Sequence, residues 1–233
     1  IAGPTHAFEP IELGKIDRYL AQGGRMFVLF NFEAMSTATG LEQLLQKWNV
    51  DVGFNWVQDT SQAEAGEQAI ILTSNYGAHP IVRPLLRSSL KIITPRSIAQ
   101  RRGPSSADAP KAVELFSTSE NGRVIIRTRL GFQQERTGVI PLAVAVERGA
   151  IPGVSEDRGA TRLVVTGDSF FLSNLAFNQA ANSDFANLAV NWLVNRDSLL
   201  SEIGPSPMNE YEILLTESQM TQLRWLFLAI IPG

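Results

Sequence analysis

Cysteine is absent from this 233-residue sequence, and histidine occurs only twice. Without cysteine, the chain forms no disulfide bond, thiolate metal site or cysteine nucleophile. The two histidines, His6 and His79, are far apart and have no carboxylates beside them at the spacing of metal ligands. The sequence therefore predicts neither a metal centre nor a cofactor.

Charged residues are also few, at 18% of the chain, and the net charge is -3. A negative chain of this kind is not expected to bind nucleic acid. No glycine-rich phosphate loop occurs, so this chain is not expected to be an ATPase, and any ATPase that acts with it is a separate chain. The length and the hydrophobic content of 44% are typical of a folded protein with a large core.

The two ends of the sequence are unusual. The chain starts at Ile1 with no charged, apolar leader, so no signal peptide is expected and the sequence resembles an excised fragment. Residues 223–233, LRWLFLAIIPG, are almost wholly apolar, yet shorter than the about 20 residues that span a bilayer. They are interpreted either as a helix docked on the core or as a membrane-proximal helix at the start of a transmembrane segment.

Helical spacing and solid apolar runs alternate along most of the chain. Helices are expected near residues 11–20, 41–48 and 182–197, and buried strands at 26–30, 69–74 and 161–166. Such alternation is typical of an α/β, doubly wound, mostly parallel sheet. Short strand patterns separated by Gly, Pro and Ser predict a mainly β insertion at about 88–150. One domain is thus expected over 1–215, followed by a C-terminal helix over 216–233.

The stretch TRLVVTGDSFFLSN, residues 161–174, places Ser169 just after an expected strand. A Gly-Asp-Ser triplet in this position opens one large group of esterases. A serine nucleophile needs a general base, however, and no histidine follows residue 79. We therefore expect no catalytic residue here, and a strand-to-helix turn in which Gly167 bends the backbone and Asp168 or Ser169 caps the next helical turn.

Polar residues follow three of the expected strands. The carboxyl ends of parallel strands share one edge of a sheet, where ligands of open α/β proteins bind. The alternative is ordinary turn and cap chemistry. The members of this expected binding rim are Asn31, Glu33, Ser74, Asn75, His79, Asp168, Ser169 and Asn174.

Basic residues are concentrated between residues 83 and 102. Such a strip fits anionic lipid headgroups or an acidic partner surface, and its alternative is a solvated strand edge protected by charge. Its members are Arg83, Arg87, Lys91, Arg96, Arg101 and Arg102.

Four blocks of sequence occur in the order GPTHAFEPIELGKIDRYLAQGGRMFVLFN, GLEQLLQKWNVDV, TRLVVTGDSFFLSN and NSDFANLAVNWLVNRD. Together they resemble the extracytoplasmic region of GldG-like proteins, which are auxiliary components of ABC-2-type transport systems, some of them linked to gliding motility. The resemblance implies a fold similar to class I glutamine-amidotransferase-like domains, also seen in intraflagellar-transport relatives, without an enzyme's nucleophile.

The same resemblance implies a role and a location. The expected protein is a non-enzymatic accessory of an ABC transporter, on the periplasmic side and anchored in the inner membrane through segments outside residues 1–233. Its expected partners are the permease and ATPase subunits, together with an envelope or exported ligand. The alternative function is a serine hydrolase or an amidotransferase-like enzyme that uses Ser169 or His79.

Overall fold

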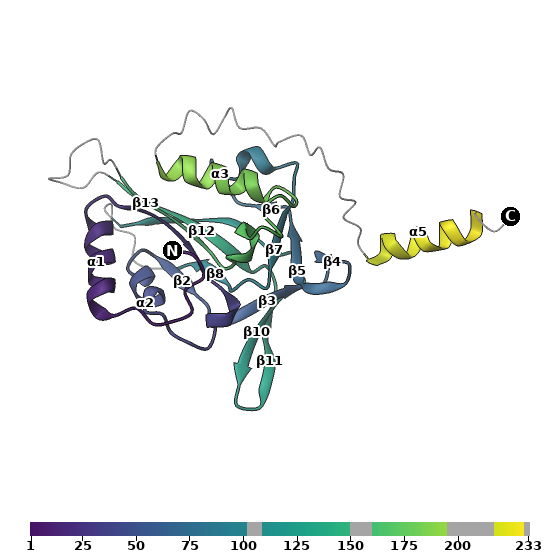
Figure 1. The fold of residues 1–233 in the computed structure, drawn as a ribbon, viewed down its shortest axis with the longest axis horizontal. Coiled ribbons are helices and arrows are strands. Elements are labelled where there is room, and N and C mark those ends of the chain that lie inside the picture. The colour runs from purple at the N-terminus through teal and green to yellow at the C-terminus, as the bar shows by residue number, and fades with distance from the viewer. Residues whose placement is uncertain (102–108, 150–159, 195–216, 231–233) are drawn as a thin grey trace.

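The computed structural model describes residues 1–101, 109–149, 160–194 and 217–230. Figure 1 shows a mixed sheet flanked by helices. The α-helices of the described residues are α1 (Pro10–Ala21), α2 (Leu41–Gln46), α3 (Asn182–Leu193) and α5 (Glu217–Ile230). Short 3-10 turns are η1 (Phe32–Ala34), η2 (Arg83–Leu85) and η4 (Phe170–Leu172).

The main sheet has five strands, and a single neighbouring pair in it is parallel. Strand β1 runs parallel to β13, and each remaining pair of neighbours is antiparallel. In spatial order the strands are β1 (Arg25–Leu29), β13 (Thr161–Thr166), β12 (Pro141–Arg148), β9 (Lys111–Ser117) and β6 (Asn75–Tyr76).

Three smaller sheets hold the remaining strands. One contains β11 (Gly131–Thr137), β10 (Gly122–Thr128) and β3 (Asn55–Asp59), in that order. Another contains β4 (Ala63–Glu64), β5 (Glu67–Thr73) and β7 (Leu90–Ile93). The last pairs β2 (Val50–Val52) with β8 (Ile98–Gln100).

The prediction of a doubly wound, mostly parallel sheet, resembling class I glutamine-amidotransferase-like domains, is wrong. Strands β9 and β12 come from the region expected to be a β insertion, yet they form the middle of the main sheet. Strand β5, expected in the same mostly parallel sheet as β1, belongs to a separate antiparallel sheet. The physical reason is that a solid apolar run indicates only that a strand is buried on both faces. Helices or a second sheet can bury a strand in this way whether its neighbours are parallel or antiparallel.

The main sheet lies between two apolar clusters, one on each face. Side chains alternate along its central strands: Leu163 and Val165 pack with α1 and α2, whereas Val164 packs with α3. All six residues of β13 are buried. This double burial explains why the middle of β13, Leu163–Val165, is continuously apolar instead of alternating.

Local sequence signals set the helix starts. Helix α1 has Pro10 in its first turn, and the backbone N–H of Glu9 donates to the Glu12 carboxylate. Such a capping box satisfies N–H groups that have no partner inside the helix. Helix α2 follows Gly40, whose φ of 90° is the left-handed conformation that glycine adopts readily.

Helix α5 has an exposed apolar surface. Trp225 is 69% exposed, and Met220 and Leu226 are also exposed. Ile231 and the side chain of Phe227 lie outside the described residues. No helix among the described residues is long and apolar enough to cross a membrane.

Candidate functional site

Four residues of the expected binding rim come together after β1 and β13. The parallel pairing of these strands aligns Leu29 with Thr166, and the Phe30 N–H donates to the Thr166 carbonyl. Asn31 and Glu33 therefore follow β1 beside Asp168 and Ser169, which follow β13.

The N-terminal segment lies against this group. A Cβ atom added to Gly3 would be 3.0 Å from the Ser169 hydroxyl oxygen and 3.6 Å from the Asn31 amide nitrogen. Asn31 is buried, and its side-chain oxygen accepts the Glu33 N–H at the start of η1. This end of the strand pair is thus closely covered by the chain's own first residues.

The other members of the expected rim lie elsewhere. Asn75 is on β6, at the opposite edge of the main sheet, where its amide donates to the Thr118 carbonyl. Ser74, the residue before it, is exposed, and so is Asn174, which lies after η4. The His79 ring packs edge-on against Trp192 of α3, with 5.0 Å between ring centroids. The structure therefore divides the expected rim into separate places.

The carboxylate of Asp168 accepts hydrogen bonds from backbone N–H groups instead of facing solvent. Its carboxylate accepts the Ile93 N–H at 2.8 Å and the Phe170 N–H at 2.6 Å. The first bond joins β7 to the turn after β13, and the second shapes η4. Burial raises the pKa of Asp168 to about 7, against the opposing effect of backbone N–H donors from Ile93, Phe170 and Phe171.

The side chain of Asn182, like that of Asp168, forms hydrogen bonds with the backbone of β7. Its side chain accepts the Lys91 N–H at 3.0 Å and donates to the Lys91 carbonyl at 2.9 Å. Together, Asn182 and Asp168 satisfy backbone groups along the outer edge of β7. This edge is therefore closed by side chains of the turn after β13 and of α3.

Ser169 has no histidine as a general base. His6 contacts the hydroxyl of Thr5 at 2.9 Å, and His79 accepts the Ile81 N–H while it packs on Trp192. These are the two histidines of the chain. A serine hydroxyl without a base and an orienting group is a weak nucleophile, so the arrangement around Ser169 does not form a catalytic triad.

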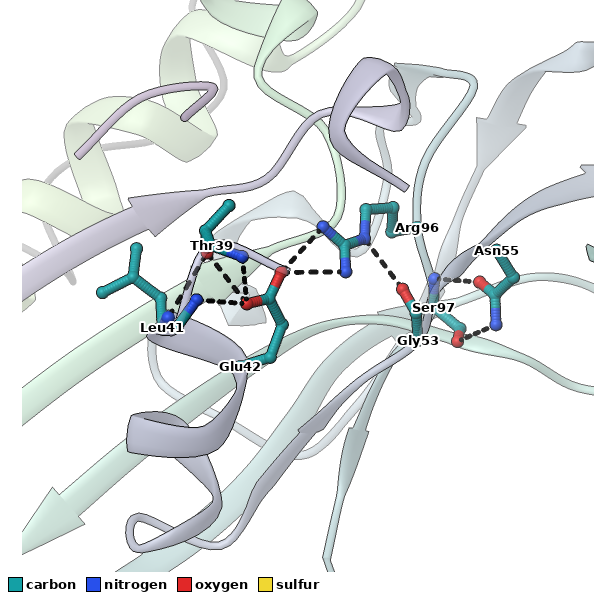
Figure 2. A network of polar contacts seen from close by, with 8 residues as sticks. Thr39, Leu41, Glu42, Gly53, Asn55, Arg96 and Ser97 are labelled. Carbon is teal, nitrogen blue, oxygen red and sulfur yellow. Dashed lines mark hydrogen bonds and ion pairs between the residues drawn. The ribbon is translucent and has the colours of Figure 1, made fainter. Parts of the chain in front are cut away.

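A buried ion pair lies against the ends of the same two strands (Figure 2). Both Nη atoms of Arg96 donate to one Glu42 carboxylate oxygen at 3.2 Å, and its Nε donates to the Gly53 carbonyl at 2.8 Å. The Arg96 backbone N–H donates to the Gly167 carbonyl just after β13. The guanidinium lies over the Phe30 ring, just after β1, at 4.8 Å from the centroid.

The second oxygen of Glu42 is also fully used. It accepts the Thr39 N–H, the Thr39 hydroxyl and the Gly40 N–H at 2.8 to 3.1 Å. Burial lowers the pKa of Arg96, and the charge of Glu42 and its hydrogen bonds oppose that shift. Because all three guanidinium nitrogens of Arg96 and both carboxylate oxygens of Glu42 have partners inside the fold, this charge is structural and is not free to bind an anion.

The expected basic strip is therefore not one surface. Arg96 is fully buried, and Lys91 forms an ion pair with Glu64 at 2.7 Å in which both side chains are mostly buried. Arg83, Arg87 and Arg101 are exposed. Arg102 lies outside the described residues.

Sequence reasoning missed the Glu42–Arg96 pair, although both residues had a signal. Thr39 and Glu42 have the spacing of a capping box before the apolar run that forms α2. Arg96 is a single charge between two apolar strands, IITP and SIA, where a buried charge needs a partner. The sequence does not show that these two segments meet.

The described residues contain no group of three or more His, Asp or Glu side chains that could hold a metal ion. At the ends of β1 and β13, the polar side chains thus form hydrogen bonds that hold neighbouring segments of the fold in place.

Comparison with known proteins identifies the fold and the family. The mmIFT52 N-terminal domain has a similar structure, with a TM-score of 0.59 at 18% sequence identity, over 83% of this chain and 75% of that one. No curated protein matches the sequence. The family model for auxiliary components of an ABC-type uncharacterized transport system matches residues 1–196. The chain therefore belongs to this family of ABC transport auxiliary components.

Proposed function

We propose that this chain is a non-enzymatic binding component of its ABC transport system, of the GldG-like kind associated with gliding motility. The single observation that carries this proposal is that the charged side chains near the ends of β1 and β13 are bound by other groups of the same chain. Asp168 holds the backbone of β7 and η4, and Glu42 holds Arg96 and the start of α2.

An enzyme built on parallel strands keeps reactive groups open to substrate at this position. Here the acidic groups are engaged by backbone N–H groups and a guanidinium, and Ser169 has no histidine partner. Membership of the auxiliary family agrees with a role in assembly with transporter subunits. The proposed partners are the permease and ATPase of the same system, and an envelope or exported ligand.

The proposed location is the periplasmic side of the inner membrane, with anchoring through segments outside residues 1–233. The exposed apolar side chains of α5, Met220, Trp225 and Leu226, support a position next to the membrane. Trp and Arg together are typical of the headgroup region, and Arg224 precedes Trp225.

Two experiments test this function. The first treats the protein with a serine-reactive fluorophosphonate and compares it with Ser169→Ala. We expect no labelling of either protein, and labelling that disappears in the variant would instead identify a serine hydrolase.

The second experiment co-expresses the full-length protein with its permease and ATPase and measures co-purification, together with protease accessibility in spheroplasts. We expect a complex and external cleavage of the domain. A protein protected from external protease in intact spheroplasts and cleaved after lysis would contradict the location.

A further inference from the structure

One hairpin stands out from the body of the molecule. Strand β10 pairs with β3 only through Gly122–Ile126, and beyond Ile126 it pairs with β11 alone. Figure 1 shows this β10–β11 hairpin projecting away from the remaining strands. Every residue of β11 is exposed, and Leu130 in the turn is 90% exposed.

Strand β11 is an open edge, unlike the edges of β1 and β7. The edge of β1 is covered by the first residues: the Leu29 N–H donates to the Ile1 carbonyl, and the Gly3 N–H to the Leu29 carbonyl. The edge of β7 is covered by Asn182 and Asp168. Among the described strands, only β10 pairs with β11.

Strand β11 has few of the features that usually keep an open edge strand from pairing with another chain. Edge strands are commonly short, or carry Pro or inward charges that prevent pairing with another chain. Strand β11 has seven residues without proline, and Gly131–Gln134 is uncharged. Its distal half is therefore suited to accept a further strand.

The face beside this edge carries side chains that are typical of binding hot spots. Trp56 and Phe132 pack edge to face, with ring centroids 4.6 Å apart. Ile125 lies opposite Trp56, and Arg127 opposite Phe132, so these four side chains share one face of the sheet. Trp and Arg are enriched among the residues that contribute most to protein–protein binding.

The hairpin is basic although the whole chain is acidic. Residues 122–137 contain four arginines and one glutamate, whereas the net charge of the chain is -3. This charge disfavours pairing of two copies along β11, because their arginines would approach one another. It favours an acidic partner, since opposite charges across an interface steer association and select the partner.

From these observations we propose that β11 binds an extended, acidic segment of a transporter subunit, which adds a strand to the β11–β10–β3 sheet. Backbone N–H and C=O groups of β11 pair with the segment, as in other cases of strand addition. The Trp56–Phe132 pair contacts an apolar side chain of the segment, and the arginines pair with its carboxylates. The identity of the partner as a transporter subunit rests on the proposed function.

The test uses the full-length protein co-expressed with the permease and ATPase of its own system. Phe132→Ala and Arg127→Glu change the hairpin, and Leu175→Ala and Arg87→Glu are matched controls on exposed residues elsewhere. We expect each hairpin variant to weaken co-purification by about tenfold or more, which is the effect of losing a hot-spot contact of at least about 1.4 kcal/mol. The controls should bind as the wild type does.

A second measurement remains valid if a variant disturbs the hairpin. A photo-crosslinking amino acid is placed at position 132 or, as the control, at position 175. We expect a crosslink from position 132 to an acidic segment of a transporter subunit, and none from position 175.

The remaining outcomes overturn the proposal in distinguishable ways. A wild-type complex that the hairpin variants leave intact, without a crosslink from position 132, removes the docking site but leaves the proposed function. Failure of the wild type to co-purify removes both. Hairpin-dependent binding to phosphatidylglycerol vesicles, or a dimer in sedimentation that Phe132→Ala dissociates, would assign the hairpin to a membrane or to a second copy instead.

Discussion

Arg96 and Glu42 are 54 residues apart in the sequence, yet both Nη atoms of the guanidinium lie 3.2 Å from the same carboxylate oxygen. Both side chains are buried, and the pair joins α2 to the segments that follow β1 and β13. In many α/β proteins a ligand binds beyond such strand ends. Here the protein's own ion pair occupies the position.

Glu42→Gln should destabilise the fold strongly. The substitution keeps the shape of the side chain but leaves Arg96 as a buried charge without its partner, which costs about 3–5 kcal/mol. Urea unfolding measures the free energy of unfolding. The matched control is Asp17→Asn at the exposed Lys47–Asp17 pair, for which a loss of at most about 1 kcal/mol is expected. Equal losses at the two sites would refute the structural role of the buried pair.

Asp168 should make stability depend on pH. Burial raises its folded-state pKa to about 7, above that of the unfolded chain, so the folded state binds more protons between these two values. The contribution of Asp168 to the free energy of unfolding is therefore greatest at low pH and falls as pH rises through about 7.

The measurement is the difference in unfolding free energy between wild type and Asp168→Asn at several pH values from 5 to 8. The difference should shift against the wild type by an amount on the order of 3 kcal/mol across this range, because Asn does not titrate. A difference that is independent of pH would mean that Asp168 does not titrate in this window.

Gly167→Ala should be destabilising because there is no space for a side chain. An added Cβ would lie 1.8 Å from the Arg96 carbonyl oxygen, and backbone cannot move aside as a flexible side chain can. The expected loss is about 2 kcal/mol or more, measured as a shift in the urea midpoint. The matched control is Gly14→Ala in α1, where nothing lies within 4 Å, and a gain of about 0.5–1 kcal/mol is expected. A neutral Gly167→Ala would contradict the close contact between these segments.

Trp225→Ala should leave the stability of the core unchanged. The side chain is 69% exposed on α5, so the free energy of unfolding should change by less than about 0.5 kcal/mol. Trp48→Ala is the control, because Trp48 is buried in the core and its loss costs about 3–5 kcal/mol. Binding to vesicles should decrease for Trp225→Ala if α5 lies at the membrane. A large loss of stability for Trp225→Ala would instead indicate a docked helix.

The sequence by itself determined the local elements. The apolar spacing near residue 16 and the pattern after Ser183 predicted α1 and α3, and the solid runs predicted β1, β5 and β13. These signals are local, because a helix face or a buried strand repeats over a few residues. The sequence shows that both histidines precede Ser169, but only the structure shows that His6 contacts Thr5 and that His79 packs on Trp192.

Only the tertiary structure decided which strands are neighbours and what the polar residues do. Apolar runs show that β12 and β13 are buried on two faces, but not that they pair antiparallel, so the doubly wound fold was the wrong choice. Arg96 was grouped with exposed basic residues because its partner, Glu42, is distant in sequence. Pairing of this kind depends on long-range packing, which brings side chains together in ways that the spacing of residues along the chain does not encode.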